Sequence, residues 1–489
     1  MEAPQSARSR PEEPVRQTRD SPWTRIRSRR DILKLGALIV AGGSVAPLLA
    51  ACAEPSRSEV ASVARSSGGG LAPSVASTTQ ALSGSITVLA EGGDPTTDTA
   101  IKKVFDDFKA QHPAVAWDIR AVSGLGGDLD RLARAELESG EPVGLVILDG
   151  LFVRAWTRDG LLADLGADPG LAHVLTRVPK RFHLSGLGET TTRAFPLALS
   201  RGVQTTGLYY NKALLDQAGL EAPRTIADLK AMVKPLSALG VAPLVYCSGD
   251  VSFNPLLVMW LLPMIAERTG DPLAFVESTI RGQVRYDSPE WIEAFQTIAD
   301  LRISGVLLEG SAATDYPTMQ LLFLQGKAAM TYNGTWLLAP LQAGTPTVPF
   351  NLHVAPLPLI DVTSRARSII SWAGFALPAA PAASRDSVYA FLEYASRPEV
   401  DRAVVEGIQS YSPIAASNAA IHDPVAREFL PMFDDAITSL NWLWEPEIDA
   451  EMSSQVQALV KGDTDPASVG KAIESVAQDL RSSGRSYYS

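Results

Sequence analysis

Cysteine and histidine are scarce in this chain of 489 residues, which contains two cysteines and five histidines. Cys52 and Cys247 do not form a disulfide framework, and the scattered histidines lack the spacing of a metal site. Cys247 ends the apolar run Leu244-Val245-Tyr246-Cys247, where cysteine usually serves as a small core residue. The sequence therefore predicts no disulfide-stabilised domain and no metal site, and we expect no cofactor.

Catalytic motifs with a fixed spacing are also absent. The chain has no Gly-x-Ser-x-Gly, no His-Glu-x-x-His and no Gly-x-x-x-x-Gly-Lys-Ser/Thr. Gly124-Leu125-Gly126-Gly127 lacks the rest of a dinucleotide-binding motif, so it is interpreted as a loop. The two carboxylates of a glycosidase need no fixed spacing in the sequence. We therefore expect a protein that is not an enzyme, with a secreted glycosidase as the alternative.

Basic residues are in the minority, with 43 Lys and Arg against 54 Asp and Glu and a formal net charge of −11. Residues 1–51 hold nine of the basic and five of the acidic residues, so removing them changes the net charge to −15. This sign of charge argues against nucleic acid or anionic lipid as a binding partner.

The N-terminal segment has the features of an export signal. Ser28-Arg29-Arg30-Asp31-Ile32-Leu33-Lys34 resembles a twin-arginine signal, although Ile32 stands where phenylalanine is commonest, which leaves the general export route open. The apolar run over residues 35–51 is short for a membrane helix and is interrupted by glycine and proline. Leu49-Ala50-Ala51-Cys52 resembles a lipoprotein signal peptidase site. Residues 1–51 are thus predicted to be cleaved and Cys52 lipidated, the alternative being a basic arm before a buried helix.

Residues 53–82 are rich in Ser, Ala, Gly and Val and contain almost no large apolar side chains. Such a composition cannot bury enough surface to fold. A flexible chain of about 30 residues spans on the order of 30 Å. We therefore interpret residues 52–82 as a lipidated cysteine followed by a tether.

The folded body begins with alternating strand and helix patterns, which predict a parallel sheet covered by helices. A second α/β region follows Pro196, and the chain from residue 384 onward is mainly helical. The strands of the first region are predicted at residues 86–90, 115–122 and 144–148, and its helices at 99–111 and 128–139.

Three blocks resemble the extracellular solute-binding proteins of ABC importers, a family that includes sugar-binding and maltodextrin-binding receptors. The first is Gly207-Leu208-Tyr209-Tyr210-Asn211-Lys212-Ala213-Leu214-Leu215 with Ala218-Gly219-Leu220 and Ala222-Pro223-Arg224-Thr225, although Ile226 stands where tryptophan is usual. The second is Phe323-Leu324-Gln325-Gly326-Lys327-Ala328-Ala329-Met330 with Asn333-Gly334-Thr335-Trp336. The third is Gly374-Phe375-Ala376-Leu377-Pro378, followed by Phe391-Leu392-Glu393-Tyr394 and Ser396-Arg397-Pro398-Glu399.

This resemblance implies an α/β fold of the two-lobed periplasmic-binding-protein type (type II), with the ligand cleft between lobes joined by hinge strands. Crossovers are expected near residues 196–200 and 354–372. The first lobe would comprise residues 83–197 and part of 355–420, which also includes hinge, and the second lobe residues 198–354 and most of 421–489.

A sugar presents apolar faces and a rim of hydroxyls, so its site needs aromatic rings together with carboxylates or amides. Acidic residues at the carboxyl ends of predicted strands are candidates, although helix capping or loop solvation is an alternative role for them. Trp336 matches the position of a sugar-stacking aromatic in the resembled family, and Trp372 lies by an expected crossover. Trp442 and Trp444 flank a predicted helix start near the C-terminus, and core packing is the alternative to a place in the cleft for both. The predicted ligand-binding residues are Glu91, Asp94, Asp149, Asp250, Phe253, Trp336, Trp372 and Trp444.

Together these features predict a lipid-anchored substrate-binding protein that captures a carbohydrate and delivers it to a membrane permease of an ABC importer. We expect a monomer. Alternatives are a receptor for a polyol, a glycerol phosphate or a polyamine, and a ligand sensor with the same fold.

Overall fold

The structure is a computed structural model that describes residues 82–92, 95–123, 127–184, 191–365, 368–380, 384–434 and 436–487. These residues belong to one compact unit, Thr78–Ser489. The predicted signal, Cys52, the tether up to residue 81 and Asp94 lie outside the described residues. Within the described ranges, no helix has the length and apolar character needed to cross a bilayer.

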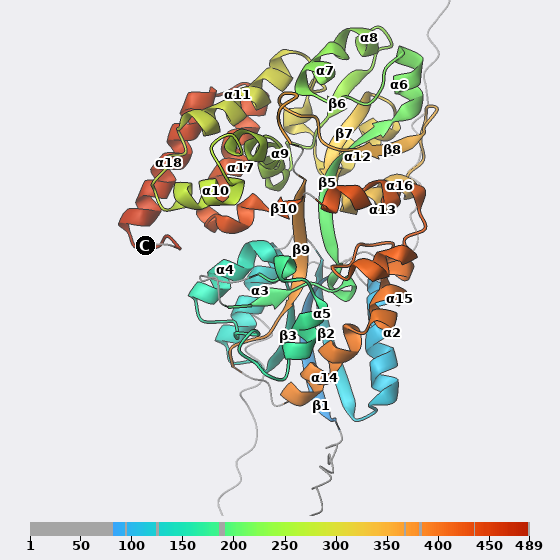
Figure 1. Ribbon diagram of the computed structural model, residues 1–489, viewed down its shortest axis with the longest axis vertical. Coiled ribbons are helices and arrows are strands. Elements are labelled where there is room, and N and C mark those ends of the chain that lie inside the picture. Colours follow the sequence, from blue (N-terminus) through green and yellow to red (C-terminus); the bar gives the residue numbers. More distant parts are fainter. Residues whose placement is uncertain are drawn as a thin grey trace, which may run out of the picture. The chain divides into compact units, whose positions relative to one another are not determined.

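Lobe 1 is built on three parallel strands in the order β2-β1-β3 (Figure 1). The side chains of β3 are almost all buried, as expected for a strand covered on both faces. Helix α2 packs against α14, where the Phe105 and Phe391 rings are stacked at 4.5 Å. The predicted strands and helices of this region are confirmed. The elements are β1 (Gly84–Gly92), α2 (Pro95–Gln111), β2 (Val115–Ser123), α3 (Gly127–Glu138), β3 (Val143–Asp149), α4 (Gly150–Arg158), α5 (Ala172–Arg177), α14 (Arg385–Ala395) and α15 (Pro398–Ile408).

Strands shared between the lobes form the crossing (Figure 1). The C-terminal half of β9 (Ile369–Ala376) pairs with β3, and its N-terminal half pairs with the start of β5 (Val203–Asn211), both antiparallel. The short β10 (Ile437–Thr438) runs parallel to β9 and is a third crossing segment. Because these strands connect the two lobes, a rotation of one lobe against the other must be absorbed in the crossing segments.

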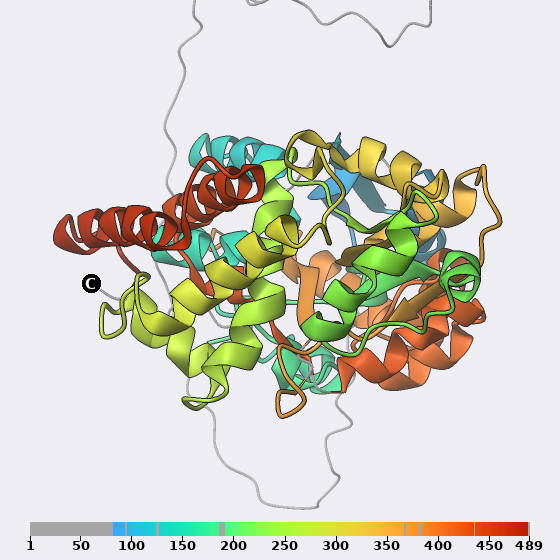
Figure 2. The same ribbon diagram turned by 90° about the horizontal axis from the view of Figure 1, so that it is seen from above.

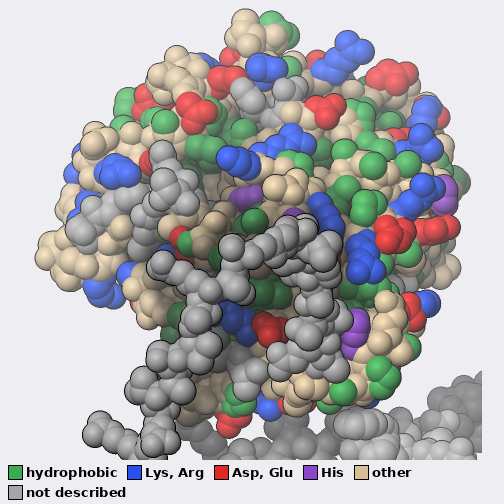
Figure 3. Space-filling view, turned by 60° about the horizontal axis from the view of Figure 1, so that its bottom comes forward, with side chains coloured by type: hydrophobic (Ala, Val, Ile, Leu, Met, Phe, Trp, Pro, Cys, Tyr) green, Lys and Arg blue, Asp and Glu red, His purple; other side chains and the backbone are tan. Residues whose placement is uncertain are grey.

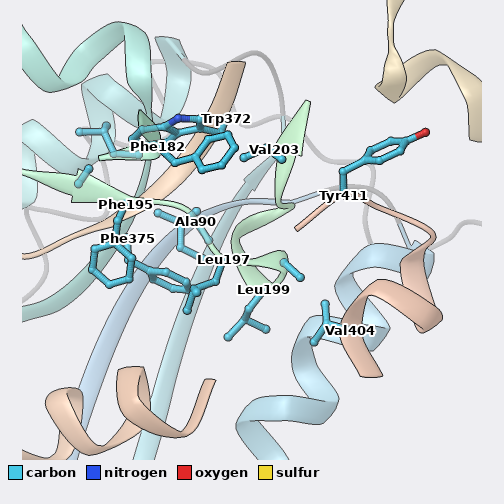
Figure 4. Packing of buried hydrophobic residues seen from close by; sticks show 14 of the residues in the cluster. Ala90, Phe182, Phe195, Leu197, Leu199, Val203, Trp372, Phe375, Val404 and Tyr411 are labelled. Carbon is cyan, nitrogen blue, oxygen red and sulfur yellow. The ribbon is translucent and has the colours of Figure 1, made fainter. Parts of the chain in front are cut away.

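Buried residues hold the start of the crossing in place. The ring of Phe195 in β4 (Ala194–Phe195) lies 6.1 Å from that of Phe375 in β9, and both belong to a buried cluster that also contains Leu197 and Leu199 (Figure 4). Asp401 of α15 is 1% exposed and accepts a hydrogen bond from the Ala198 backbone nitrogen at 2.9 Å. Burial raises the pKa of Asp401. The turn before β5 is thus tied to lobe 1 by both apolar and polar contacts.

The turn into β5 requires a glycine. Gly202 has a φ of +65°, and a Cβ atom there would lie 2.0 Å from the Tyr411 carbonyl oxygen. The preceding Arg201 also has a positive φ of 67°. Two successive left-handed residues turn the chain sharply between lobe 1 and the crossing strand.

Lobe 2 has the strand order β5-β7-β6, with β8 also paired to β5. Helix α9 is apolar all round and all of its residues are buried, so it forms the centre of this lobe. The last two helices, α17 and α18, lie side by side (Figure 2). The strands are β6 (Ala242–Val245), β7 (Ala328–Gly334) and β8 (Leu352–Ala355). The helices are α6 (Lys212–Ala218), α7 (Ile226–Ala231), α8 (Val233–Ser237), α9 (Asn254–Ala266), α10 (Pro272–Ile280), α11 (Pro289–Ile303), α12 (Tyr316–Leu324), α13 (Leu338–Ala343), α16 (Pro424–Glu428), α17 (Pro446–Lys461) and α18 (Pro466–Ser482).

Short 3-10 helices connect these elements. Those that matter for the site are η3 (Val251–Phe253), η5 (Thr335–Leu337) and η8 (Leu440–Leu443). The others are η1 (Lys180–Phe182), η2 (Ala198–Ser200), η4 (Ser311–Ala313), η6 (Ala415–Ala420) and η7 (Leu430–Phe433). Acidic, basic and hydrophobic side chains are interspersed on the face shown in Figure 3, as is typical of a solvent-exposed surface.

Candidate ligand-binding cleft

A cavity of about 880 Å³ is lined by residues of both lobes and of the crossing strands. This volume lies within the range of small-molecule sites, about 300–1,000 Å³. Lobe 1 contributes Asp149, Leu151 and Phe152 from the β3–α4 region and Arg131 from α3. The crossing contributes Arg201, Gln204, Ile369, Ser371 and Ser439. Lobe 2 and its connecting segment contribute Asp250, Ser252, Phe253, Leu256, Met259, Tyr316, Trp336, Asn441, Trp442, Pro446, Asp449 and Ala450.

Three aromatic side chains form the lobe 2 wall of the cavity. The rings of Phe253 and Tyr316 are stacked at 4.7 Å with an interplanar angle of 8°. The hydroxyl of the buried Tyr246 donates to the Phe253 carbonyl oxygen, which holds η3 against the core. Trp336 is partly exposed in η5. Flat apolar surfaces of this kind are suited to contact the C–H face of a ring-shaped ligand.

The position of Trp336 depends on the glycine that ends β7. A Cβ atom at Gly334 would lie 2.0 Å from the Trp336 ring, so only glycine leaves room for the indole. The Tyr209 hydroxyl donates to the Gly334 carbonyl oxygen at 2.8 Å and fixes this turn from the core. The Asn-Gly-Thr-Trp block therefore places one aromatic ring at the cleft.

Two of the predicted acidic residues line the cavity and also accept hydrogen bonds from backbone nitrogens. The Asp149 side chain is the N-cap of α4 and accepts from the Leu151 nitrogen at 2.8 Å. Asp250 accepts from the Tyr316 nitrogen at 2.6 Å and so fixes the start of α12 against η3. The capping role considered for Asp149 is therefore present together with a place in the cavity wall. Both carboxylates shape the site through these hydrogen bonds.

Trp442 lines the cavity, although the sequence analysis selected Trp444 in its place. Its ring lies edge-on to Trp372 at 5.0 Å, and a Cβ atom at Gly150 would lie 2.5 Å from it. Gly150 is the first residue of α4 in lobe 1, whereas Trp442 follows the crossing strand β10. Trp442 therefore connects the crossing, the lobe 1 wall and the cavity.

Two predicted tryptophans do not reach the cavity. Trp372 is 3% exposed and packs beneath Trp442, and Trp444 is fully buried in lobe 2 with its ring 6.2 Å from Trp291. Neither belongs to the lining residues. Trp372 is covered by the ring of Trp442, and Trp444, which follows η8, packs into the lobe 2 core beside Trp291. Glu91 lies near the C-terminal end of β1, and its side chain, like Asp94, lies outside the described part of the structure.

Tyr316, Phe152, Asn441 and Asp449 line the cavity but were missed by the sequence interpretation. Tyr316 had a local signal, since Asp315-Tyr316-Pro317 begins a helix with an N-cap aspartate and a proline in the first turn. Asp449 is one of two acidic residues in the first turn of α17 and had no distinguishing pattern. Burial raises its pKa to about 6.

Two features of the described residues bear on metal ligation and thiol chemistry. No cluster of three or more His, Cys, Asp and Glu able to hold a metal ion occurs among the described residues. Cys247 is buried, and burial raises the pKa of its thiol well above the usual range, which disfavours the reactive thiolate. The cleft instead combines aromatic faces with amide, hydroxyl and carboxylate groups, a set suited to binding by stacking and hydrogen bonds.

The family model of bacterial extracellular solute-binding proteins matches residues 92–402. The chain belongs to this family. The solute-binding protein is 21% identical over 340 residues to the maltotriose-binding protein of Pyrococcus abyssi, a match that covers 66% of this chain and 65% of the relative. It is 19% identical over 259 residues to the multiple sugar-binding protein of Streptococcus mutans, covering 51% of this chain and 57% of the relative. The chain thus spans less than two thirds of the length of either relative.

Solved structures support the two-lobed fold. The GacH receptor of Streptomyces glaucescens, whose structures include a complex with acarbose, superposes with a TM-score of 0.65 at 22% identity. The alignment covers 82% of this chain and 98% of that receptor. The expected α/β fold of a two-lobed solute-binding protein, with the cavity between the lobes, is therefore confirmed.

Proposed function

We propose that this solute-binding protein captures a carbohydrate in the interlobe cleft and delivers it to the membrane permease of an ABC importer. The observation that carries the proposal is the lobe 2 wall, in which Phe253, Tyr316 and Trp336 present aromatic surface beside Asp250 and the polar groups of the crossing. The sugar-binding relatives support the same ligand class. We also propose that the protein acts by binding and not by catalysis.

Capture requires the lobes to close over the ligand. Lining residues come from both lobes, so a ligand held by one wall gains further contacts when the other wall approaches. These extra contacts exist only in the closed state and shift the equilibrium between open and closed forms toward it. The closed form is the state that a permease would recognise.

The anchoring proposed from the sequence fits this role. Lipidation at Cys52, behind a cleaved signal, would hold a monomeric receptor at the membrane through the tether of residues 53–82. Restriction to the membrane surface raises the local concentration of the receptor near its permease. The net negative charge is unsuited to nucleic acid as a partner.

A thermal-shift screen of the purified protein tests the ligand class, because a ligand that binds only the folded state raises Tm. The screen should contain maltotriose, raffinose, a chitin oligosaccharide and a xylo-oligosaccharide, with polyols, glycerol phosphate and polyamines as competing classes. We expect a carbohydrate to give the largest rise. A rise confined to polyols, glycerol phosphate or polyamines would replace the ligand class, and turnover of a labelled oligosaccharide would contradict the binding role.

A further inference from the structure

Asp449 differs from the other two acidic residues described in the cavity wall. Asp149 and Asp250 accept hydrogen bonds from backbone nitrogens. The Asp449 Oδ1 atom is buried and has no hydrogen-bond partner among the described residues. Buried polar atoms in folded proteins are almost always hydrogen-bonded, so an unpartnered carboxyl oxygen in a ligand cavity requires an explanation.

The surroundings of Asp449 do not compensate a negative charge. The charged groups across the cavity are Arg131, Arg201, Asp149 and Asp250, whereas the causes that act on the pKa of Asp449 are burial and a side-chain hydrogen bond from Asn441. Glu447 on the same helix is paired with Arg485 at 3.0 Å.

Burial and hydrogen bonding act on the Asp449 carboxyl in opposite directions, and their sum favours its neutral form. Burial raises the pKa of Asp449 to about 6, and a hydrogen bond from Asn441 opposes this rise only in part. The uncharged form therefore predominates below this pH in the ligand-free protein.

We propose that Asp449 is a specificity-determining residue whose carboxylate accepts hydrogen bonds from ligand hydroxyl groups, so that ligand capture releases its proton to the solvent. This inference rests on the proposed function, because it requires a ligand with hydroxyl donors. Hydrogen bonds to the charged form of a carboxyl favour ionisation, so the hydroxyl groups of a bound sugar would lower the pKa of Asp449. Hydrogen bonds to charged groups are also stronger than neutral ones, which makes this contact selective.

The consequence is a pH-dependent affinity. Below about pH 6 the ligand-free protein must lose a proton to bind, so the affinity falls by about tenfold per pH unit as the pH decreases. Above this pH the affinity becomes constant. No histidine lines the cavity in the described ranges, and burial places the pKa of Asp449 in this interval.

Isothermal titration calorimetry on the full chain tests the inference, with each carbohydrate that raises Tm, beginning with maltotriose. Titrations at about pH 5 and about pH 7.5, each in two buffers of different ionisation enthalpy, measure affinity and proton release together. We expect wild type to release close to one proton at the lower pH and to bind more tightly at the higher pH. Asp449→Asn should lose the pH dependence and bind about tenfold or more weakly at the higher pH.

The matched control is Glu447→Gln, on the same helix with a side chain 45% exposed, which should keep both the affinity and the proton release of wild type. Wild-type affinity that is constant over this pH range, without proton release, would overturn the inference and leave carbohydrate binding intact. The measurement on wild type needs no variant, so it still tests the inference if Asp449→Asn misfolds. Undiminished binding by a folded Asp449→Asn protein would also overturn it. If no carbohydrate binds at either pH, the proposed function fails and the inference falls with it.

Discussion

The two walls of the cleft differ in chemistry. The lobe 2 wall carries the stacked pair Phe253 and Tyr316 together with Trp336, whereas the lobe 1 wall carries Arg131, Asp149 and a single aromatic ring. In the proposed mechanism the two walls therefore contribute different kinds of contact to the ligand. The aromatic wall provides most of the apolar contact to a bound sugar, and the lobe 1 wall adds polar contacts on closure.

The largest loss is expected on the aromatic wall. Trp336→Ala should weaken carbohydrate binding by about 1–3 kcal/mol through lost apolar and stacking contact. Calorimetry measures this directly. Trp336→Phe is the matched control and should retain most of the affinity because it keeps an aromatic face. An affinity for Trp336→Ala equal to that of wild type would remove Trp336 from the site and weaken the contrast between the walls.

The contact between Trp442 and Gly150 joins the walls, and Gly150→Ala should disturb it. Alanine is favoured over glycine in a helix by about 0.5–1 kcal/mol, so a loss of stability at this position must come from the clash with the indole. We expect a lower Tm and an affinity reduced by about 1–2 kcal/mol.

Trp442→Ala provides the control for that clash. In this background the space beside Gly150 is free, so adding Gly150→Ala should lower neither Tm nor affinity further. Additive effects of the two substitutions would show that the clash between residue 150 and Trp442 does not cause the loss of stability and affinity.

A smaller effect is expected for the single aromatic ring of the lobe 1 wall. Phe152→Ala should cost about 1 kcal/mol or less of affinity, since this wall is engaged only after closure. Calorimetry should measure the loss of carbohydrate affinity for Phe152→Ala and for Trp336→Ala side by side. A greater loss for Phe152→Ala than for Trp336→Ala would reverse the assignment of the two walls.

The Asp449 carboxyl should make the free energy of unfolding of the ligand-free protein depend on pH. The pKa of Asp449 is raised from 3.8 to about 6, so between these values the folded state binds more protons than the unfolded state. Its contribution to the free energy of unfolding therefore decreases as the pH rises through this interval. Asp449→Asn should raise Tm relative to wild type more at about pH 7.5 than at about pH 5. An equal Tm difference at both values would contradict the buried, ionisable state.

The smallest effect on the cleft is expected for Cys52→Ala. This substitution removes the proposed lipid attachment, so cell fractionation should find the protein released from the membrane. Carbohydrate affinity should not change, because the cleft is formed by residues from 131 onward. Membrane retention of Cys52→Ala would argue against lipidation at this residue.

The sequence predicted the fold well where local patterns are strong. Buried strands such as β3 and the glycine-containing block before Trp336 carry their structure in short segments, and the structure places Asp149, Asp250, Phe253 and Trp336 in one cavity.

Residues whose role depends on distant contacts were not predictable. Trp442 and Trp444 are two positions apart with the same side chain, and only their contacts with Gly150 of α4 and Trp291 of α11, respectively, separate the cleft residue from the core residue. The same holds for Asp449, whose pKa is set by a burial that no short sequence pattern encodes.

Calorimetric titration of the purified protein with maltotriose, raffinose and the other carbohydrates of the screen tests the central claim most directly. Saturable binding of one ligand per protein, without turnover and weakened by Trp336→Ala but not by Trp336→Phe, is the predicted result. Binding that is unaffected by Trp336→Ala, or the absence of binding by every carbohydrate tested, would contradict carbohydrate capture in this cleft.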